Sequence, residues 1–210
     1  MKIKVMILII LMFSISSNLF AQKKIVTRYF TAFEVEGFLI TSGGNDMIDN
    51  SNQVLGGNVQ LMLETTEKFA MGLSIGILNL SYSLNANNDL PVKKNLNYTY
   101  LPISFNIRDY NSKKILESRF YLAGEIKYCL TLNGTEIQDN EYSLTDILMT
   151  SVGVGLSIPT NTASSFDITT QFGFMAYGLK MKDPDIESET NTEFQSSFFL
   201  KIGAIYRFQL

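Results

Sequence analysis

The segment of residues 194–208, at the end of this chain, alternates apolar with small or polar side chains and closes on two aromatic residues. Successive side chains of a β-strand point to opposite faces, so every second residue lies on the same face. The other face carries Lys201, Gly203 and Arg207 together with Phe199 and Ile205. From Phe198 onward, the face opposite to these residues is apolar and consists of Phe198, Leu200, Ile202, Ala204, Tyr206 and Phe208. The pattern predicts a strand with one fully apolar face.

The first residues have the features of an export signal. Lys2 and Lys4 precede an uninterrupted apolar run over residues 5–13, and small and polar residues then lead to Ala21 and Gln22. The run is about half of the ~20 residues that a membrane-spanning helix needs, which favours a cleaved signal over a permanent anchor. We therefore expect residues 1–21 to be a Sec-type signal peptide and residues 22–210 to form a single exported domain.

Period-two alternation recurs in eight segments that are separated by turn-rich residues. A tilted membrane-spanning strand needs about 9–11 residues, and each segment is long enough. An even number of antiparallel strands closes without an exposed edge, as a bilayer requires. The pattern predicts an all-β fold, an eight-stranded antiparallel up-and-down transmembrane β-barrel with its apolar faces outward. The segments are residues 30–40, 53–63, 69–82, 96–107, 119–132, 143–158, 166–177 and 194–208.

The spacing of Lys201, Gly203, Tyr206 and Phe208 resembles the signal by which the barrel-assembly machinery recognises bacterial outer-membrane barrels. Residues 98–105 (YTYLPISF) and 120–124 (FYLAG) are similar to consecutive strands of the PorT-like family, small outer-membrane barrels of Bacteroidetes. The resemblance implies a barrel in the cell outer membrane of a Gram-negative bacterium, in contact with outer-membrane lipid and with the barrel-assembly machinery. It implies no particular activity, since the roles of the family's members are diverse and mostly undefined.

The connections between the segments alternate in length. Those expected at the periplasmic end are residues 64–68, 108–118 and 159–165, and the outer ones are residues 41–52, 83–95, 133–142 and 179–193. The outer set is longer on average, as in outer-membrane barrels. It contains eleven acidic and four basic residues. We therefore expect acidic outer loops that contact a partner protein or lipopolysaccharide.

Outward aromatic residues are expected to gather toward the periplasmic end. A soluble barrel with aromatic residues scattered through its core does not predict such clustering, whereas a membrane interface does. The residues are Phe33, Phe69, Phe105, Phe120, Phe166, Tyr206 and Phe208.

The chemistry open to this chain is limited by its composition. It has no histidine and one cysteine, Cys129, so a Ser-His-acid centre and a thiolate metal cluster are both excluded. Eight strands leave an interior just wide enough for side chains, so we expect inward charges to fill it as ion pairs. No catalytic residue, cofactor or metal is predicted, while a narrow ion path and a carboxylate-based hydrolase remain alternatives. The inward charges are Glu34, Glu36, Arg119, Glu125, Lys127, Asp167, Lys201 and Arg207.

Three functions are compatible with these features. The first is a monomeric structural or interaction barrel, not an enzyme, that presents its outer loops. The second is a narrow channel for ions or small solutes. The third is an exported soluble barrel that binds an apolar ligand, as lipocalins do, with the apolar face inside. No nucleic-acid partner is expected, because the net charge is −3 and nucleic-acid binding needs a basic surface. The terminal motif and the aromatic clustering favour the first function.

Overall fold

The computed structural model describes residues 28–41, 48–49, 53–66, 68–84, 94–115, 117–134, 142–182 and 190–210. These residues form the strands β1 (Arg28–Thr41), β2 (Ile48–Asp49), β3 (Gln53–Thr66), β4 (Phe69–Leu84), β5 (Lys94–Ile115), β6 (Ser118–Gly134), β7 (Tyr142–Pro159), β8 (Ser164–Lys182) and β9 (Thr190–Gln209). The expected signal peptide lies outside the described residues. None of the described residues belongs to a helix long and apolar enough to cross a bilayer.

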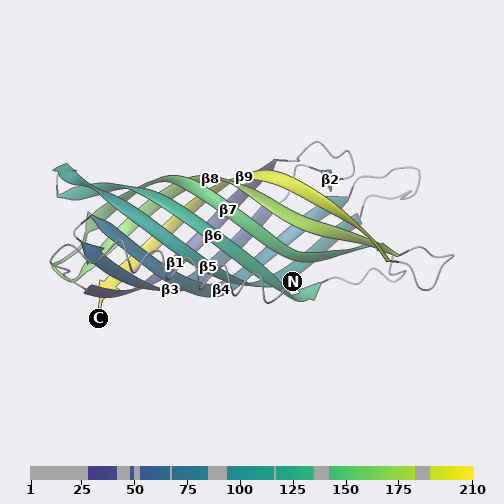
Figure 1. Ribbon diagram of the computed structural model, residues 1–210, viewed down its shortest axis with the longest axis horizontal. Helices are drawn as coiled ribbons and strands as arrows, with labels where there is room; N and C mark the ends of the chain where they lie inside the picture. Colours follow the sequence, from purple (N-terminus) through teal and green to yellow (C-terminus); the bar gives the residue numbers. More distant parts are fainter. Residues whose placement is uncertain are drawn as a thin grey trace.

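Eight long strands form a closed antiparallel barrel (Figure 1). Around the ring they follow the order β1, β9, β8, β7, β6, β5, β4 and β3, and β3 pairs again with β1. The first and last strands are therefore neighbours, with Phe30 opposite Gln209 and Thr41 opposite Phe198. The short strand β2 pairs with the last two residues of β4. The predicted eight-stranded barrel is confirmed.

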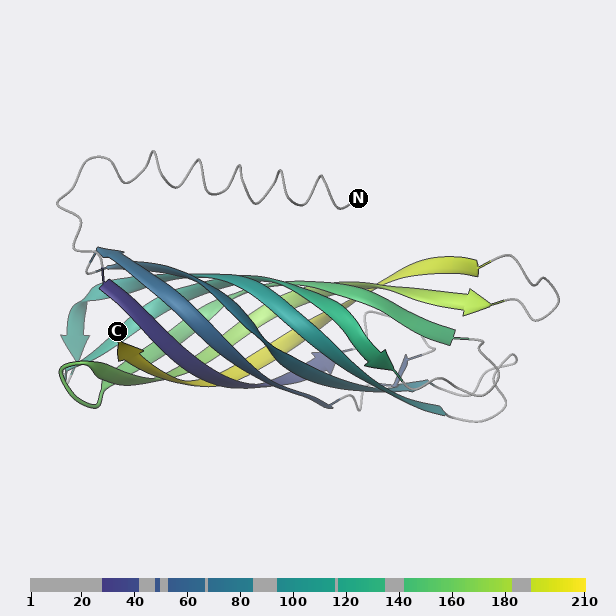
Figure 2. The ribbon, with the colours of Figure 1, turned by 90° about the horizontal axis from the view of Figure 1, so that it is seen from below.

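The two ends of the barrel differ in their connections. At one end, here called the turn end, tight connections join Thr66 to Phe69, Ile115 to Ser118 and Pro159 to Ser164. The C-terminus lies at this same end (Figure 2). The opposite end, toward which β1, β4, β6 and β8 run, is called the loop end. The expected outer loops fall largely outside the described residues.

One expected connection is wrong. Residues 108–118 were interpreted as a long turn, but β5 continues to Ile115 and β6 begins at Ser118. The residues that follow Ile107 are polar, which suggests a loop, yet they keep the strand alternation. Arg108 consequently lies on the inward face of β5 and is buried.

The outer surface of the barrel is apolar. On β4, Leu73, Ile75 and Ile77 are about half exposed, whereas Ser74 between them is buried. Phe120, Leu122 and Ile126 on β6 are exposed in the same way, while Glu125 and Lys127 are buried. The barrel is thus apolar outside and partly charged inside, the reverse of a soluble lipocalin-like barrel.

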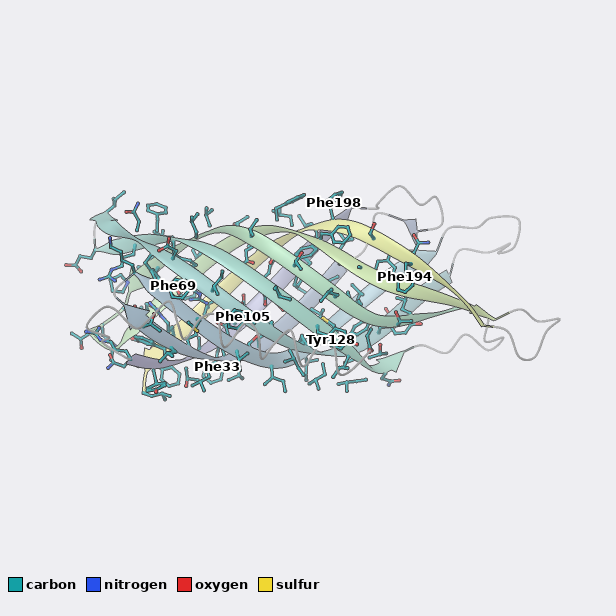
Figure 3. The ribbon with its side chains drawn as sticks, viewed as in Figure 1. Phe33, Phe69, Phe105, Tyr128, Phe194 and Phe198 are labelled. Atoms are coloured by element: carbon teal, nitrogen blue, oxygen red, sulfur yellow. The ribbon has the colours of Figure 1, made fainter. Side chains whose placement is uncertain are left out.

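Outward aromatic side chains occur at both ends of the barrel. Phe33 and Phe69 lie toward the turn end, and Phe194 and Phe198 lie toward the loop end (Figure 3). Phe194 is 87% exposed and Phe198 is 49% exposed. The sequence interpretation, which confined the aromatic girdle to the turn end, is therefore incomplete. Membrane barrels carry such girdles at both interfaces.

Two glycines on inward faces make room for inward rings. A Cβ at Gly155 would overlap the ring of Tyr121 on the neighbouring strand, and one at Gly173 would overlap the ring of Phe199. Because the interior of an eight-stranded barrel is narrow, large inward side chains need such gaps opposite them. Packing thus explains Gly155 of β7 and Gly173 of β8.

Candidate functional site: the barrel interior

The inward face of each long strand changes character along the barrel axis. On β1, Phe30 is followed inside by Glu34 and Glu36 and then by Phe38 and Ile40. Strands β3, β4, β5 and β6 also contribute to an apolar layer at the turn end, whereas β7, β8 and β9 carry the polar residues Ser157, Ser165 and Arg207 there. Along the axis the interior has three layers. The turn-end cluster consists of Phe30, Met62, Ala70, Tyr110, Tyr121 and Ala123. The loop-end cluster consists of Phe38, Ile40, Val54, Leu78, Leu80, Tyr98, Tyr100, Cys129, Leu144, Ile147, Met149, Met175, Tyr177 and Phe199. Between them lies the polar layer, which is centred on Glu34, Glu36, Gln60, Arg108, Glu125, Lys127, Asp167 and Lys201.

Lys201 is the centre of the polar layer. Its Nζ lies 3.0 Å from Glu34 Oε1, 2.8 Å from Glu36 Oε2 and 2.7 Å from Glu125 Oε2. Lys127 donates to Glu36 and lies 3.4 Å from Glu125 Oε1. All of these side chains are at most 3% exposed. Pairing of this kind offsets the free-energy cost of burying these charges.

The ion pairs cross the interior from wall to wall. In the ring order β1 and β6 are four strands apart, on opposite sides of the barrel, so the Lys127–Glu36 pair spans the full diameter. A second bridge joins Arg108 Nη1 on β5 to Asp167 Oδ2 on β8 at 2.8 Å. Gln60 links the two bridges, because it accepts from Arg108 at 3.0 Å and donates to Glu34. The polar layer is therefore one continuous network.

The structure places the eight expected inward charges in two groups. Glu34, Glu36, Glu125, Lys127, Asp167 and Lys201 meet in the polar layer. Arg207 lies instead near the turn end, where it bonds to hydroxyl groups. Arg119 is on the inward face at the turn-end mouth and is half-buried.

Sequence reasoning missed Arg108, which supplies the fourth positive charge inside the barrel. The signal was present, since Ser104, Asn106 and Arg108 alternate on one face of β5 and all three are buried. It also missed the loop-end cluster. Tyr98 and Tyr100 are spaced for the same inward face of β5, as Met175 and Tyr177 are on β8.

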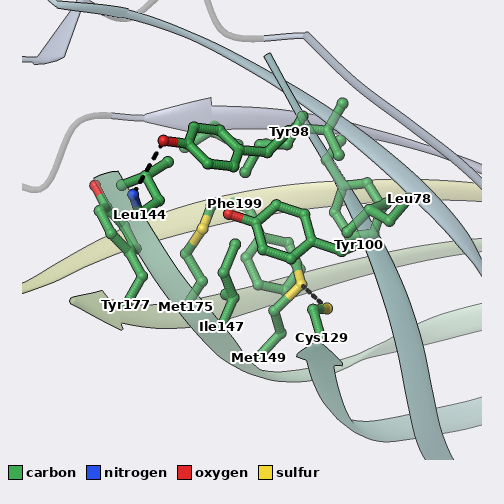
Figure 4. Close-up of a cluster of buried hydrophobic side chains, with 14 residues drawn as sticks. Leu78, Tyr98, Tyr100, Cys129, Leu144, Ile147, Met149, Met175, Tyr177 and Phe199 are labelled. Atoms are coloured by element: carbon green, nitrogen blue, oxygen red, sulfur yellow. Dashed lines mark hydrogen bonds between the residues drawn. The ribbon is translucent and has the colours of Figure 1, made fainter. Parts of the chain in front are cut away.

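The loop-end cluster fills the interior on the loop-end side of the polar layer. Figure 4 shows its side chains. The Leu144 N–H donates to the hydroxyl of Tyr98 at 3.1 Å. Cys129 is fully buried with its Sγ 3.9 Å from Met149 Sδ, so it packs as a small apolar residue.

The interior has little free space within the polar layer. A cavity of about 10 Å³ lies among Glu34, Gln60, Asn106 and Arg108, with further lining from β6, β8 and β9. Such a volume holds about one water molecule. In this form the barrel is plugged by its own side chains.

The four residues of the proposed assembly signal divide between the two faces of β9. Lys201 and Gly203 point inward and are buried, whereas Tyr206 points outward and is 45% exposed. The ring of Phe208 lies 6.4 Å from that of Tyr206 and 6.0 Å from that of Phe33 on β1. Recognition of this strand by the assembly machinery stays a prediction.

Solved structures with a similar architecture are small outer-membrane barrels. OprG from Pseudomonas aeruginosa superposes with a TM-score of 0.57 at 11% identity, over 87% of this chain and 97% of that one. AlkL, determined in lipid bilayers, gives a TM-score of 0.58 at 13% identity, over 87% and 90%. Outer membrane protein W of Escherichia coli gives 0.52 at 15% identity, over 86% and 97%. The fold is that of the small outer-membrane barrels.

The likeness to these proteins extends to the fold alone, because the identities are low. No family model and no curated protein matches the chain, so the resemblance to the PorT-like family stays a prediction from its motifs. Within the described residues, no group of three or more His, Cys, Asp or Glu side chains is arranged to hold a metal ion.

Proposed function

We propose that the protein is a non-catalytic barrel of the bacterial outer membrane, plugged along its axis, that acts through the loops at its loop end. One observation supports this most strongly: the outward side chains are apolar and the inward ones include seven charged groups joined in ion pairs. Soluble monomers rarely expose apolar patches larger than a few hundred Å². A continuous apolar belt around a barrel instead suits lipid.

The belt gives way to polar side chains toward the loop end. On the outer face of β4 and β5, Ser81 donates to Asn97 at 2.7 Å and Thr99 donates to Asn79 at 3.0 Å. Directly before them in β4 come the outward residues Ile75 and Ile77. Such a change supports placing the outer edge of the hydrocarbon layer between Ile77 and Asn79. The turn end then faces the periplasm.

The packed interior argues against the two other functions that the sequence allows. Binding sites for apolar ligands are cavities of about 300–1,000 Å³, whereas the cavity in the polar layer is about 10 Å³. A channel for ions would need the Lys127–Glu36 and Arg108–Asp167 bridges to part. Removing either charge from such a buried pair is unfavourable by several kcal/mol.

The loops are proposed to bind a basic partner protein. Their acidic surplus, eleven acids against four bases in the expected loops, attracts basic groups over about 8 Å at physiological salt. Most of these residues lie outside the described part of the chain. The support for this part of the proposal is therefore the sequence.

Cell fractionation tests the location. We expect the protein in the detergent-soluble outer-membrane fraction, resistant to extraction by alkali or high salt. Recovery as a free periplasmic protein would contradict the membrane proposal.

Planar-bilayer recording of the purified protein tests the plug. We expect no steady conductance, with a known open porin as the positive control. Steady, reproducible ion-conducting steps would show that the interior opens and would favour the channel.

A further inference from the structure

Three of the four arginines of this chain meet at the turn-end mouth. The sequence contains Arg28, Arg108, Arg119 and Arg207, and all but Arg108 line one pocket of about 420 Å³. They come from three strands, β1, β6 and β9. The described residues that line the pocket include these three arginines and no lysine, although the sequence has thirteen lysines.

Arg207 is the most enclosed of the three. It is only 9% exposed, and its guanidinium lies over the rings of Phe30 and Tyr110, 4.8 and 5.4 Å from their centroids. Nε donates to Ser165 Oγ at 3.1 Å, Nη1 to Tyr110 Oη at 2.8 Å and Nη2 to Ser157 Oγ at 3.3 Å. No carboxylate of the described residues lies within ion-pair distance of it. Arg207 is thus a buried cation with neutral partners.

The guanidinium of Arg207 has donors to spare. Arginine carries five N–H groups, and three of them are used by the hydroxyls. One N–H remains on each of Nη1 and Nη2. Guanidinium N–H groups are well suited to the oxygens of a carboxylate or a phosphate.

The rest of the pocket is positively charged and rich in donors. Among the described residues that line it, the acids are Glu64 and Glu117, against three arginines. Glu64 stands directly opposite Arg28 in the β1–β3 register. The connection between β7 and β8 adds Asn161, Thr162 and Ser164 to the lining. A positive charge is therefore left over in a partly enclosed, hydrogen-bonding site.

We propose that this pocket is a binding site for a small oxyanion, a phosphate or carboxylate group, with Arg207 as its central ligand. Arg28 and Arg119 close the mouth of the site around the anion. Ser157 and Ser165 hold the guanidinium in place through its occupied donors. The site goes beyond the proposed function, because it lies at the end of the barrel opposite the loops and depends on neither loop nor plug.

Guanidinium NMR of the intact protein tests the site. With four arginines, the ¹⁵N–¹H spectrum of the arginine Nε groups contains four side-chain signals. The protein is refolded in a detergent without phosphate groups, and sodium phosphate replaces sodium chloride at constant ionic strength. We expect saturable shifts of the Arg207, Arg28 and Arg119 signals, with Arg108 in the polar layer unmoved.

Substitutions distinguish a specific anion-binding site from general electrostatic attraction of the anion to a basic surface. Arg207→Gln should weaken phosphate binding at least about tenfold, because it removes a charge-assisted hydrogen-bonding pair. Should that variant fail to refold, Arg28→Gln provides the alternative, since Arg28 is exposed and its loss should weaken binding about two- to fivefold. Lys68→Gln, which removes an exposed charge at the same end outside the pocket, should change the affinity less than twofold.

A second arm distinguishes a free anion from a lipid headgroup. Shifts induced by phosphatidylglycerol nanodiscs, but absent with inorganic phosphate and with phosphatidylcholine nanodiscs, would support the site and assign the phosphate to lipid. Shifts in no condition, equal shifts of all four arginines, or an effect of Lys68→Gln as large as that of Arg28→Gln would each overturn the proposal.

Discussion

Lys201 contacts carboxylates from two opposite walls of the barrel. Glu34 and Glu36 belong to β1 and Glu125 belongs to β6. Three acids and the two lysines, Lys201 and Lys127, make this part of the polar layer negative by one charge. Loss of either lysine would leave carboxylates buried without enough positive charge. The stability of the barrel should therefore depend strongly on these two side chains.

Replacing Lys201 with Met should lower the free energy of unfolding by about 3–5 kcal/mol, because it leaves buried carboxylates without their shared cation. Urea unfolding after refolding in vitro measures this, and it removes any effect of Lys201 on recognition in the cell. Lys68→Met at the exposed turn should change the free energy by at most about 1 kcal/mol. Adding Glu125→Gln to Lys201→Met should recover part of the loss. Equal stabilities of Lys201→Met and Lys68→Met would refute the network.

Much of the interior could be predicted from alternation, and the exceptions have physical reasons. Six of the eight expected charges meet in the polar layer, since strand periodicity places them inside and the narrow interior forces them together. Alternation shows which face of a strand a residue is on, but not its position along the barrel axis. It therefore could not separate Arg119 and Arg207, near the turn end, from the six expected charges that meet in the polar layer. Position along the axis depends on strand register, which only the pairing of neighbouring strands supplies.

Strand β4 runs along the outer surface from the turn end to the loop end. Its outward residues are apolar from Phe69 to Ile77 and polar at Asn79 and Ser81. Ile75 therefore lies within the expected hydrocarbon layer, and Asn79, four residues further along the same strand, lies at its edge.

Arginine at Ile75 should destabilise the barrel in lipid by about 1–3 kcal/mol, because an outward cation below the edge of the hydrocarbon layer loses hydration. Arginine at Asn79 should cost only about 0–1 kcal/mol at the edge. Denaturant unfolding in vesicles measures both. The same penalty at the two positions would contradict the proposed membrane boundary.

Strand β9 is part of the barrel wall and carries the predicted assembly signal. Replacing both Tyr206 and Phe208 with Asp should strongly reduce the outer-membrane level of the protein, because faulty recognition adds to a modest interfacial penalty. Ile202→Asp is the control, since Ile202 lies on the same outward face but outside the proposed signal. Immunoblots of outer-membrane fractions measure the levels. Normal levels of the double variant would refute the assembly signal.

The strands themselves were largely predictable, whereas their ends were not. All eight long strands contain the segments that alternation marks, with additions at their ends. β5 exceeds its predicted end by eight residues, at Ile115 rather than Ile107, because its polar continuation resembles a loop in composition. Polar side chains can lie in the interior of this barrel or in water at its two rims. A run of polar residues therefore does not mark the end of a strand.

At the scale of the whole molecule, the stability of the barrel should not depend on the acidic loops, whereas binding of a partner should. Deleting residues 183–189, which contain four acids, should leave the free energy of unfolding unchanged within about 0.5 kcal/mol, as expected for surface residues away from the core. It should weaken binding to a basic partner protein, and more so at low salt. Surface plasmon resonance on refolded protein tests this, and unchanged binding at low salt would contradict the proposed role of the acidic loop.

The central claim is that the apolar face meets lipid, and spin-label accessibility tests it most directly. Labels are placed singly at Ile75, Ile126 and Val154, which point outward, and at Ser74, which points inward, after replacement of the buried Cys129 with Ala. In vesicles, the account predicts strong relaxation by oxygen and weak relaxation by a water-soluble nickel complex at the three outward positions. It predicts weak relaxation by both reagents at Ser74, because the interior is packed. Strong relaxation by the nickel complex at Ile75, Ile126 and Val154 would place this face in water and contradict the account.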